Sequence, residues 1–328
     1  MGKSCPPGHK SMSRSTMAAP RRPAAPPNPP GVEEHFVEID GARMRYLRSG
    51  SGPALILVHG LMGYSFSWRY VMPVVSRVAT VYAVDLLGAG FSDRPPDLDC
   101  RLRPSAERLL QFLEKLGISQ FDLLGTSHGG AVAIRAAAML SEKPSPQLGR
   151  LILVAPVNPW SPHGRWLAPL LGSRFGSRMF VRVAGNRPAA HGWALRRLFG
   201  NPAKIHPGTL EGYMAPAALP GYLEYGLKIA SHWTDGLREL NSALPKAARY
   251  PTLLMWGSHD RAVYASSAEP LRRQFQDCDL VVFAGVGHLP YEEAADEFNQ
   301  TLMRFLETSS SSHPPAGTSR AAAIRDSR

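Results

Sequence analysis

The 328-residue sequence predicts an α/β fold with a mainly parallel, eight-stranded sheet, helices on both faces and an inserted helical cap. Short aliphatic runs alternate with helical patterns of roughly 10–15 residues, as in parallel strands joined by helical crossovers. The middle runs are continuously apolar, which is typical of strands covered on both faces. One interval between strands, residues 157–244, is too long for a simple crossover and predicts an additional helical unit.

The expected strands follow one another through two core segments, residues 33–156 and 245–307. A hairpin is predicted first, because the turn pair Asp40-Gly41 separates two short apolar-rich runs. The strands, with that hairpin leading, are His35–Ile39, Ala42–Leu47, Ala54–Val58, Thr80–Asp85, Phe121–Leu124, Leu151–Ala155, Thr252–Trp256 and Leu280–Phe283. The helices expected between and after them are Arg103–Leu116, Ala131–Leu140, Ser266–Gln276 and Glu292–Leu306.

The interval 157–244 is rich in aromatic residues at helical spacing, so we expect a cap packed over one edge of the sheet. It carries ten bases and four acids, a net charge of +6. This charge could attract an anionic acyl substrate, or an anionic membrane surface that carries ester lipids. Alternatively, the arginines face water while the aromatic residues line an apolar pocket, and the number of aromatic residues favours this second interpretation.

Both ends of the chain are predicted to be disordered extensions, residues 1–32 and 308–328, because they consist of proline-, serine- and alanine-rich sequence without an apolar signal region. These tails hold +7 of the formal net charge of +11. A basic folded face for nucleic acid is therefore not indicated. The three cysteines have neither metal-ligand nor disulfide spacing, and no apolar run is long enough to span a membrane. We expect a cytoplasmic protein without structural zinc.

The strongest chemical signal is Gly125-Thr126-Ser127-His128-Gly129, placed directly between an expected strand and an expected helix. This G-x-S-x-G pattern forms a tight turn that presents the serine hydroxyl above the sheet, and the turn requires small neighbours such as Gly125 and Gly129. The positive end of the following helix favours the negative charge that develops when the serine attacks. Ser127 is therefore the predicted nucleophile.

A serine hydroxyl needs a base that is itself oriented by a third group. His288 follows the last expected strand, and Asp260 follows the strand before it. Because the carboxyl ends of parallel strands meet at one edge of a sheet, both side chains are expected near Ser127. The chain order Ser, Asp, His is the order found in this type of fold.

The segment His59-Gly60-Leu61 follows the strand Ala54–Val58 and predicts an oxyanion hole. The backbone N–H groups of Leu61 and His128 are its expected donors, each worth roughly 3–4 kcal/mol to the transition state. The His59 ring is expected to support the turn by hydrogen bonding. This chemistry requires neither a cofactor nor a metal.

Residues from about 52 to 306 resemble the α/β-hydrolase superfamily in these motifs and their order. Asp85 to Asp93 also resembles that family's D-x-x-G-x-G-x-S turn, whose role is structural. The resemblance implies Ser127 as nucleophile, His288 as base and Asp260 as orienting acid. Haloalkane dehalogenases and soluble epoxide hydrolases are similar around His59 and His288, but they use aspartate as nucleophile. A serine indicates acyl transfer instead.

The sequence therefore predicts a serine hydrolase that cleaves a carboxylic ester, with an apolar small-molecule ester as its partner. Two alternatives stay open. A hydrolase of carbon–carbon bonds in dienone acids also uses Ser, Asp and His beneath a cap, but those enzymes resemble one another in a tryptophan after the histidine, where this chain has Leu289. A non-catalytic small-molecule receptor shares the fold, although the intact set of three residues argues against it.

Overall fold

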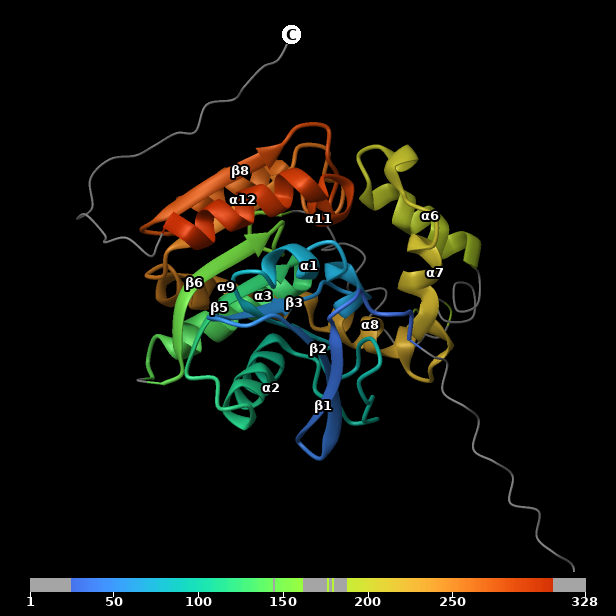
Figure 1. Cartoon of the computed structure of the whole chain (residues 1–328), viewed down its shortest axis with the longest axis horizontal. Coiled ribbons are helices and arrows are strands. Elements are labelled where there is room, and N and C mark those ends of the chain that lie inside the picture. Colours follow the sequence, from blue (N-terminus) through green and yellow to red (C-terminus); the bar gives the residue numbers. More distant parts are fainter. Residues whose placement is uncertain (1–24, 144, 162–175, 177–178, 180–187, 309–328) are drawn as a thin grey trace, which may run out of the picture.

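The computed structural model describes residues 25–143, 145–161, 176, 179 and 188–308 (Figure 1). Its centre is an eight-stranded sheet in the order β1-β2-β4-β3-β5-β6-β7-β8. The predicted α/β fold is confirmed. The strands are β1 Glu33–Ile39, β2 Ala42–Ser49, β3 Ala54–Val58, β4 Thr80–Val84, β5 Gln120–Thr126, β6 Gln147–Val154, β7 Thr252–Gly257 and β8 Cys278–Phe283.

The predicted hairpin forms the first edge of the sheet. β1 and β2 pair in antiparallel fashion, and the turn residues Asp40 and Gly41 have φ values of 51° and 72°. Positive φ at both central turn positions matches the right-handed twist of the two strands. β2 also runs antiparallel to β4, whereas the pairings from β4 through β3 to β8 are parallel. The carboxyl ends of the parallel strands therefore share one edge.

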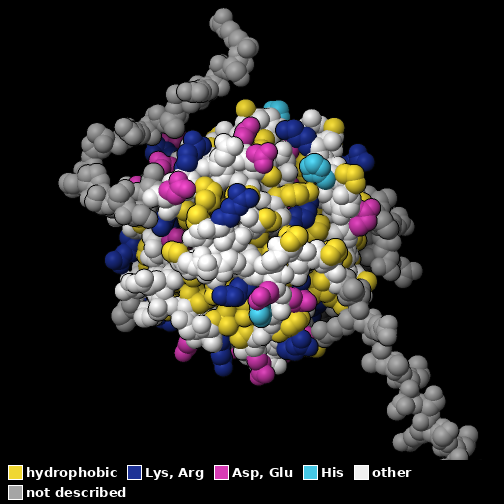
Figure 2. Space-filling model, in the orientation of Figure 1, with side chains coloured by type: hydrophobic (Ala, Val, Ile, Leu, Met, Phe, Trp, Pro, Cys, Tyr) yellow, Lys and Arg dark blue, Asp and Glu magenta, His cyan; other side chains and the backbone are white. Residues whose placement is uncertain are grey.

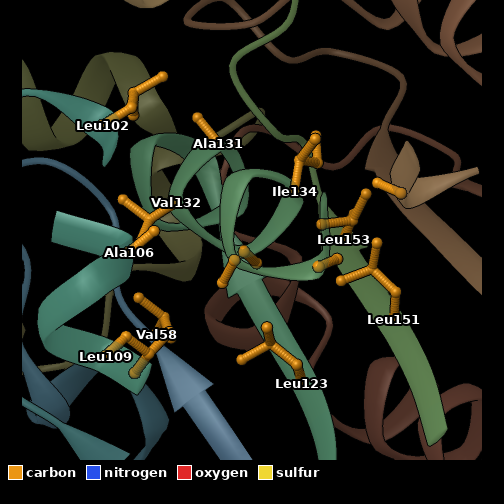
Figure 3. Packing of buried hydrophobic residues seen from close by; sticks show 14 of the residues in the cluster. Val58, Leu102, Ala106, Leu109, Leu123, Ala131, Val132, Ile134, Leu151 and Leu153 are labelled. Atoms are coloured by element: carbon orange, nitrogen blue, oxygen red, sulfur yellow. The ribbon is translucent and has the colours of Figure 1, made fainter. Parts of the chain in front are cut away.

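Side chains of the central strands alternate between two buried clusters, one on each face of the sheet. Within β3, Leu55 and Leu57 belong to one cluster, and Ile56 and Val58 belong to the other. Figure 3 shows the second cluster, in which Val58 and side chains of β5 and β6 meet residues of the covering helices. Burial on both faces explains why these strands read as continuous apolar runs.

Helices cover both faces. One face packs against α2 Leu102–Lys115, α3 Ser127–Leu140, α9 Trp233–Ala247 and α10 Ala268–Arg272, and the other against α1 Met72–Val75 and α12 Ala295–Thr308. Short helical turns η1 Ser65–Trp68, η4 Ala265–Ser267 and α11 Pro290–Glu293 complete the core. Two predicted helices differ from those observed. The expected helix Ser266–Gln276 is shorter, and Glu292–Leu306 is divided at Ala294, whose φ of −135° interrupts the helical backbone.

The interval after β6 contains α6 Pro188–Leu198, η2 Pro202–Lys204, α7 Thr209–Met214, η3 Ala215–Ala218 and α8 Tyr222–Ser231, which lie together at one side of the molecule (Figure 1). The predicted cap boundary at residue 244 falls inside α9. This helix buries Leu237, Leu240 and Leu244 with the core cluster of α3, because it is the crossover between β6 and β7. Five of the ten cap bases, among residues 165–187, lie outside the described residues.

Parts of the predicted extensions have defined positions. Val32 packs against the buried cluster beneath β1, because an apolar residue directly before a strand can reach the core. Pro26 to Pro29 line a cavity of about 280 Å³ together with Arg45 and Tyr64. Thr308 belongs to α12. The predicted disorder of residues 1–24 and 309–328 concerns segments outside the described residues.

Candidate active site

Ser127 occupies a strained turn between β5 and α3. Its φ is 52°, in the left-handed region that a residue with a side chain rarely adopts. A Cβ at Gly125 would lie 2.4 Å from the Gly129 carbonyl oxygen, and one at Gly129 would lie 2.2 Å from the His59 carbonyl oxygen. The two glycines therefore make the tight strand-to-helix turn possible. Because α3 begins at Ser127, the serine lies at the positive end of that helix.

His288 and Asp260 form a buried pair at the same edge of the sheet. His288 Nδ1 lies 2.7 Å from Asp260 Oδ2, and both side chains are almost fully buried. The second oxygen, Asp260 Oδ1, accepts backbone N–H groups from Ala262 at 2.7 Å and Val263 at 2.9 Å. These bonds fix the carboxylate and make it an acceptor for an Nδ1–H group. The Nε2 atom of His288 is then the ring nitrogen left for proton transfer.

A cavity of about 340 Å³ brings the candidate residues together. Its lining includes Ser127, His288, Gly60 and Leu61, contributed by segments far apart in the sequence. A Cβ placed on Gly60 would lie 3.0 Å from the Ser127 Cβ, so the turn after β3 lies directly against the serine. The volume is near the lower end of small-molecule sites, which span about 300–1,000 Å³.

The turn at Gly60 and Leu61 is closed by a hydrogen bond from the Gly63 N–H to the Gly60 carbonyl oxygen at 3.0 Å. The His59 ring stabilises this turn by hydrogen bonds to backbone groups. Its Nε2 atom accepts the Leu86 N–H at 3.1 Å, so Nδ1 carries the proton and donates to the Gly60 carbonyl oxygen at 2.8 Å. Burial lowers the pKa of His59, which keeps the ring neutral. The ring thus has the supporting position that the sequence predicts.

The His128 side chain lies away from the cavity that holds Ser127. Its ring contributes to a separate small cavity with Trp233 and Leu237 of α9. Burial, together with the neighbouring His59, lowers the pKa of His128 to about 4, so the ring is uncharged at neutral pH. His128 therefore offers the active-site edge its backbone at the start of α3, and its side chain belongs to the helix packing.

The Asp85 side chain is buried and bonds to several segments of the surrounding turn. Asp85 Oδ1 accepts the Ser65 N–H at 2.7 Å, and Oδ2 accepts the Phe91 N–H at 3.0 Å and pairs with Arg45 at 3.1 Å. The Ser92 hydroxyl donates to the Asp85 carbonyl oxygen at 2.6 Å. These bonds fix the segment beside the Gly60 turn, consistent with the structural role that the resemblance implies.

A family model described as the alpha/beta hydrolase fold matches residues 53–295. The chain belongs to this family. It is 28% identical over 281 residues to the dihydrolipoyllysine-residue acetyltransferase component of the acetoin cleaving system of Pseudomonas putida, covering 84% of this chain and 70% of that protein. It is 27% identical over 290 residues to the 2-hydroxymuconate semialdehyde hydrolase of Pseudomonas sp. strain CF600, covering 86% and 96%. A solved bacterial membrane phospholipase A is similar with a TM-score of 0.71 and 27% identity, covering 86% and 88%.

In this alpha/beta hydrolase, Glu293 joins the histidine loop to the segment after α6, a contact that the sequence does not reveal. Its carboxylate is buried and accepts the N–H groups of Gly200 at 2.8 Å, Asn201 at 2.7 Å and Gly287 at 2.8 Å. The His288 N–H also donates to the Leu198 carbonyl oxygen at 2.6 Å. The segment 198–201 is therefore bonded directly to the loop that carries His288.

A second buried connection lies beside it. Glu292 forms an ion pair with Arg69 and accepts the Tyr213 hydroxyl at 2.7 Å, and Arg69 also donates to Thr209 at 3.2 Å. Burial raises the pKa of Glu292, while Arg69 opposes that shift. Tyr213 and Thr209 belong to α7 of the cap, so this pair also ties the cap to the core. Neither acid follows a local motif, because each partner comes from a distant segment.

Within the described ranges, no helix is long and apolar enough to cross a membrane. In the same part of the chain, His, Cys, Asp and Glu side chains do not gather in a group of three that could hold a metal ion. Figure 2 shows Lys and Arg interspersed with Asp and Glu on the face that it presents, without a continuous basic area.

Proposed function

We propose that this chain is a serine hydrolase that cleaves a carboxylic ester through an acyl-enzyme intermediate. The observation that carries the proposal is the shared cavity: Ser127 and His288 line it, and His288 is paired at 2.7 Å with the buried carboxylate of Asp260. The left-handed backbone at Ser127 supports the same assignment, since strain of this kind is concentrated at functional positions.

In the proposed reaction, the Ser127 Oγ atom attacks the ester carbonyl carbon while His288 Nε2 accepts its proton. Asp260 holds the imidazole in the correct tautomer and stabilises its positive charge. The backbone N–H groups of Leu61 and His128 stabilise the oxyanion. His288 then returns the proton to the departing alcohol. A water molecule next attacks the acyl-enzyme while His288 Nε2 accepts its proton. His288 returns this proton to Ser127 Oγ as the carboxylic acid leaves. None of these steps draws on a cofactor.

We assign a small-molecule ester as the partner and propose no nucleic-acid role. The free thiols of Cys100 and Cys278 support a cytoplasmic location, where thiols stay reduced. The sequence also raised contact between the basic cap and an anionic membrane; we do not favour it, because the aromatic residues of the same interval indicate an apolar pocket.

Labelling with a fluorophosphonate probe and turnover of p-nitrophenyl esters test the proposal. The wild type should be labelled stoichiometrically, and Ser127→Ala should abolish labelling and reduce kcat by about 10⁴-fold or more. Ser242→Ala changes an exposed serine of α9 and should leave both signals intact. An unreactive wild type would favour a non-catalytic receptor.

A second candidate is a carbon–carbon bond hydrolase. The 27% identity to a 2-hydroxymuconate semialdehyde hydrolase over nearly the whole of that protein favours it. Leu289 stands where the dienone-acid enzymes resemble one another in a tryptophan, which weakens this candidate. Cleavage of a dienone acid without any ester turnover would replace the first proposal with the second.

A further inference from the structure

Three cap helices present regularly spaced side chains to the cavity that holds Ser127. The lining residues of α6 and of α8 each follow a helical i, i+3, i+4, i+7 spacing, and α7 adds one shorter turn of the same kind. From α6 these include Ala194, Leu195 and Leu198, and from α8 they include Leu223, Leu227 and Ala230, while Tyr222 of α8 lines the cavity outside this spacing. One continuous face of each helix therefore forms the cavity wall.

Small residues create the free space between these walls. Ala194, Gly226 and Ala230 occupy positions where the same helices otherwise present leucine. Gly226 also allows α8 to approach the turn after β3, because a Cβ there would lie 2.7 Å from the Met62 sulfur. A larger side chain at Ala194 or Ala230 would occupy cavity volume.

The described lining is mainly apolar, and His191 and His288 are its two histidines. It contains no Lys, Arg, Asp or Glu among the residues that the structure describes, and leucine, methionine and alanine make up most of it. Burial raises the pKa of Tyr222 to about 12 and raises that of Tyr213 as well, so both phenols are neutral at pH 7. A buried substrate carboxylate would find no described Lys or Arg to replace its water, which makes its binding costly.

From these observations we infer that the cavity takes an uncharged hydrocarbon chain of the ester, held between α6 and α8, with a size limit set in part by the residues at positions 194 and 230. This inference rests on the proposed function and names the substrate class of the same site. The chain can belong to the acyl group or to the alcohol, since the apolar recognition is the same for both.

The test measures kcat/KM for p-nitrophenyl esters of increasing acyl length, from acetate to laurate, and for alkyl acetates of increasing alcohol length. In the series whose chain enters the cavity, kcat/KM should rise about threefold to fourfold per methylene until the cavity is full. Whichever series shows the rise identifies the bound half of the ester. A flat profile in both series would overturn the inference.

Substitutions in the cavity wall test where the hydrocarbon chain of the ester binds. Ala230→Leu and Ala194→Leu should shorten the preferred chain and reduce kcat/KM for the longest good substrate at least tenfold, with acetate changing less than threefold. Ala194 is exposed at the cavity rim, so its variant remains informative if the more enclosed Ala230→Leu folds poorly. Ala190→Leu makes the same change at an exposed position of α6 outside the lining and should leave the profile unchanged. An unchanged length profile in both cavity variants would contradict the assignment.

A carboxylate at the end of the chain provides the charge test. The half-ester should be turned over at least 100-fold less efficiently than the neutral ester of equal length. Equal turnover would overturn the uncharged-chain inference. Failure of the proposed function looks different: the protein would then neither react with the fluorophosphonate nor hydrolyse the acetate ester.

Discussion

At the residue scale, Ser127 is set apart by its strained backbone, and His59 and His288 are set apart by the partners of their ring nitrogens. Ser127 adopts φ of 52° at a cost on the order of 1–3 kcal/mol, which the surrounding packing must offset. His59 has both ring nitrogens bonded to backbone groups, so its tautomer is fixed. His288 has one ring nitrogen bonded to Asp260, which leaves the other nitrogen for the proton transfer that we propose. Two histidines near one serine thus have separate tasks because their hydrogen-bond partners differ.

His128 should make stability depend on pH. Its pKa is lowered to about 4 in the folded protein, below an unfolded value near 6.5, so the unfolded chain binds the proton first as pH falls. The free energy of unfolding should therefore decrease from pH 6.5 toward pH 4, by about 2 kcal/mol between pH 6.5 and 5. Urea unfolding at several pH values should show a shallower decrease for His128→Gln. The exposed His206→Gln is the control, and identical slopes in all three proteins would refute the assignment.

Two consecutive acids of α11 connect the core to the helices inserted between β6 and α9. Glu292 pairs with Arg69 and bonds to Tyr213, whereas Glu293 binds backbone groups on both sides of the interface. Because α11 follows the loop of His288 directly, any displacement of the cap segment at Gly200 is transmitted to that loop. The break between α11 and α12 allows both carboxylates to face the buried interface.

Glu293 should act as a positioning residue for His288. Glu293→Ala leaves three N–H groups without their acceptor, of which the one at Gly287 is buried, so we expect a loss of about 1–3 kcal/mol in stability and a fall of about tenfold or more in kcat. The KM should change little, because Glu293 is not part of the cavity lining. Steady-state kinetics and the rate of fluorophosphonate labelling check this.

Glu293→Gln retains one acceptor oxygen and should recover part of kcat. The matched control is Glu297→Gln, an exposed position of α12. A drop in stability with an unchanged kcat would assign Glu293 a structural role alone.

At the scale of the whole molecule, the cavity is enclosed jointly by the edge of the sheet and by the helices α6, α7 and α8. The sheet edge supplies Ser127 and His288, and α6, α7 and α8 supply the apolar walls. The hydrogen bonds of Glu293 and the Arg69–Glu292 ion pair join these two parts and fix their relative position. Occupation of the cavity should therefore stabilise both parts together.

Hydrogen exchange can test this coupling. After reaction with a long-chain alkyl fluorophosphonate, amide protection should increase in α6 and α8 as well as around Ser127. A methyl-sized fluorophosphonate should protect the start of α3 and leave α6 and α8 nearly unchanged. Equal protection of the cap helices by both reagents would show that chain contact is not the cause.

Local patterns in the sequence were sufficient to predict the sheet and the edge at which the candidate reacting groups meet. Alternation and apolar runs gave all eight strands close to their observed bounds, because strands buried on both faces leave a distinct composition. The glycines around Ser127 predicted the strained turn, since a tight turn restricts side-chain size within a few residues. His288 and Asp260 could be paired in advance because parallel strands end at the same edge.

The remaining features depend on contacts between distant segments. The crossover role of α9, the Glu293 connection to Gly200 and the inward faces of α6 and α8 have no local signature, because amphipathic spacing shows that a helix has an apolar face without showing what the face meets. The sequence by itself thus determined the fold class and the candidate reacting groups. The tertiary structure decided which surfaces enclose the cavity, since that depends on how the cap packs on the core.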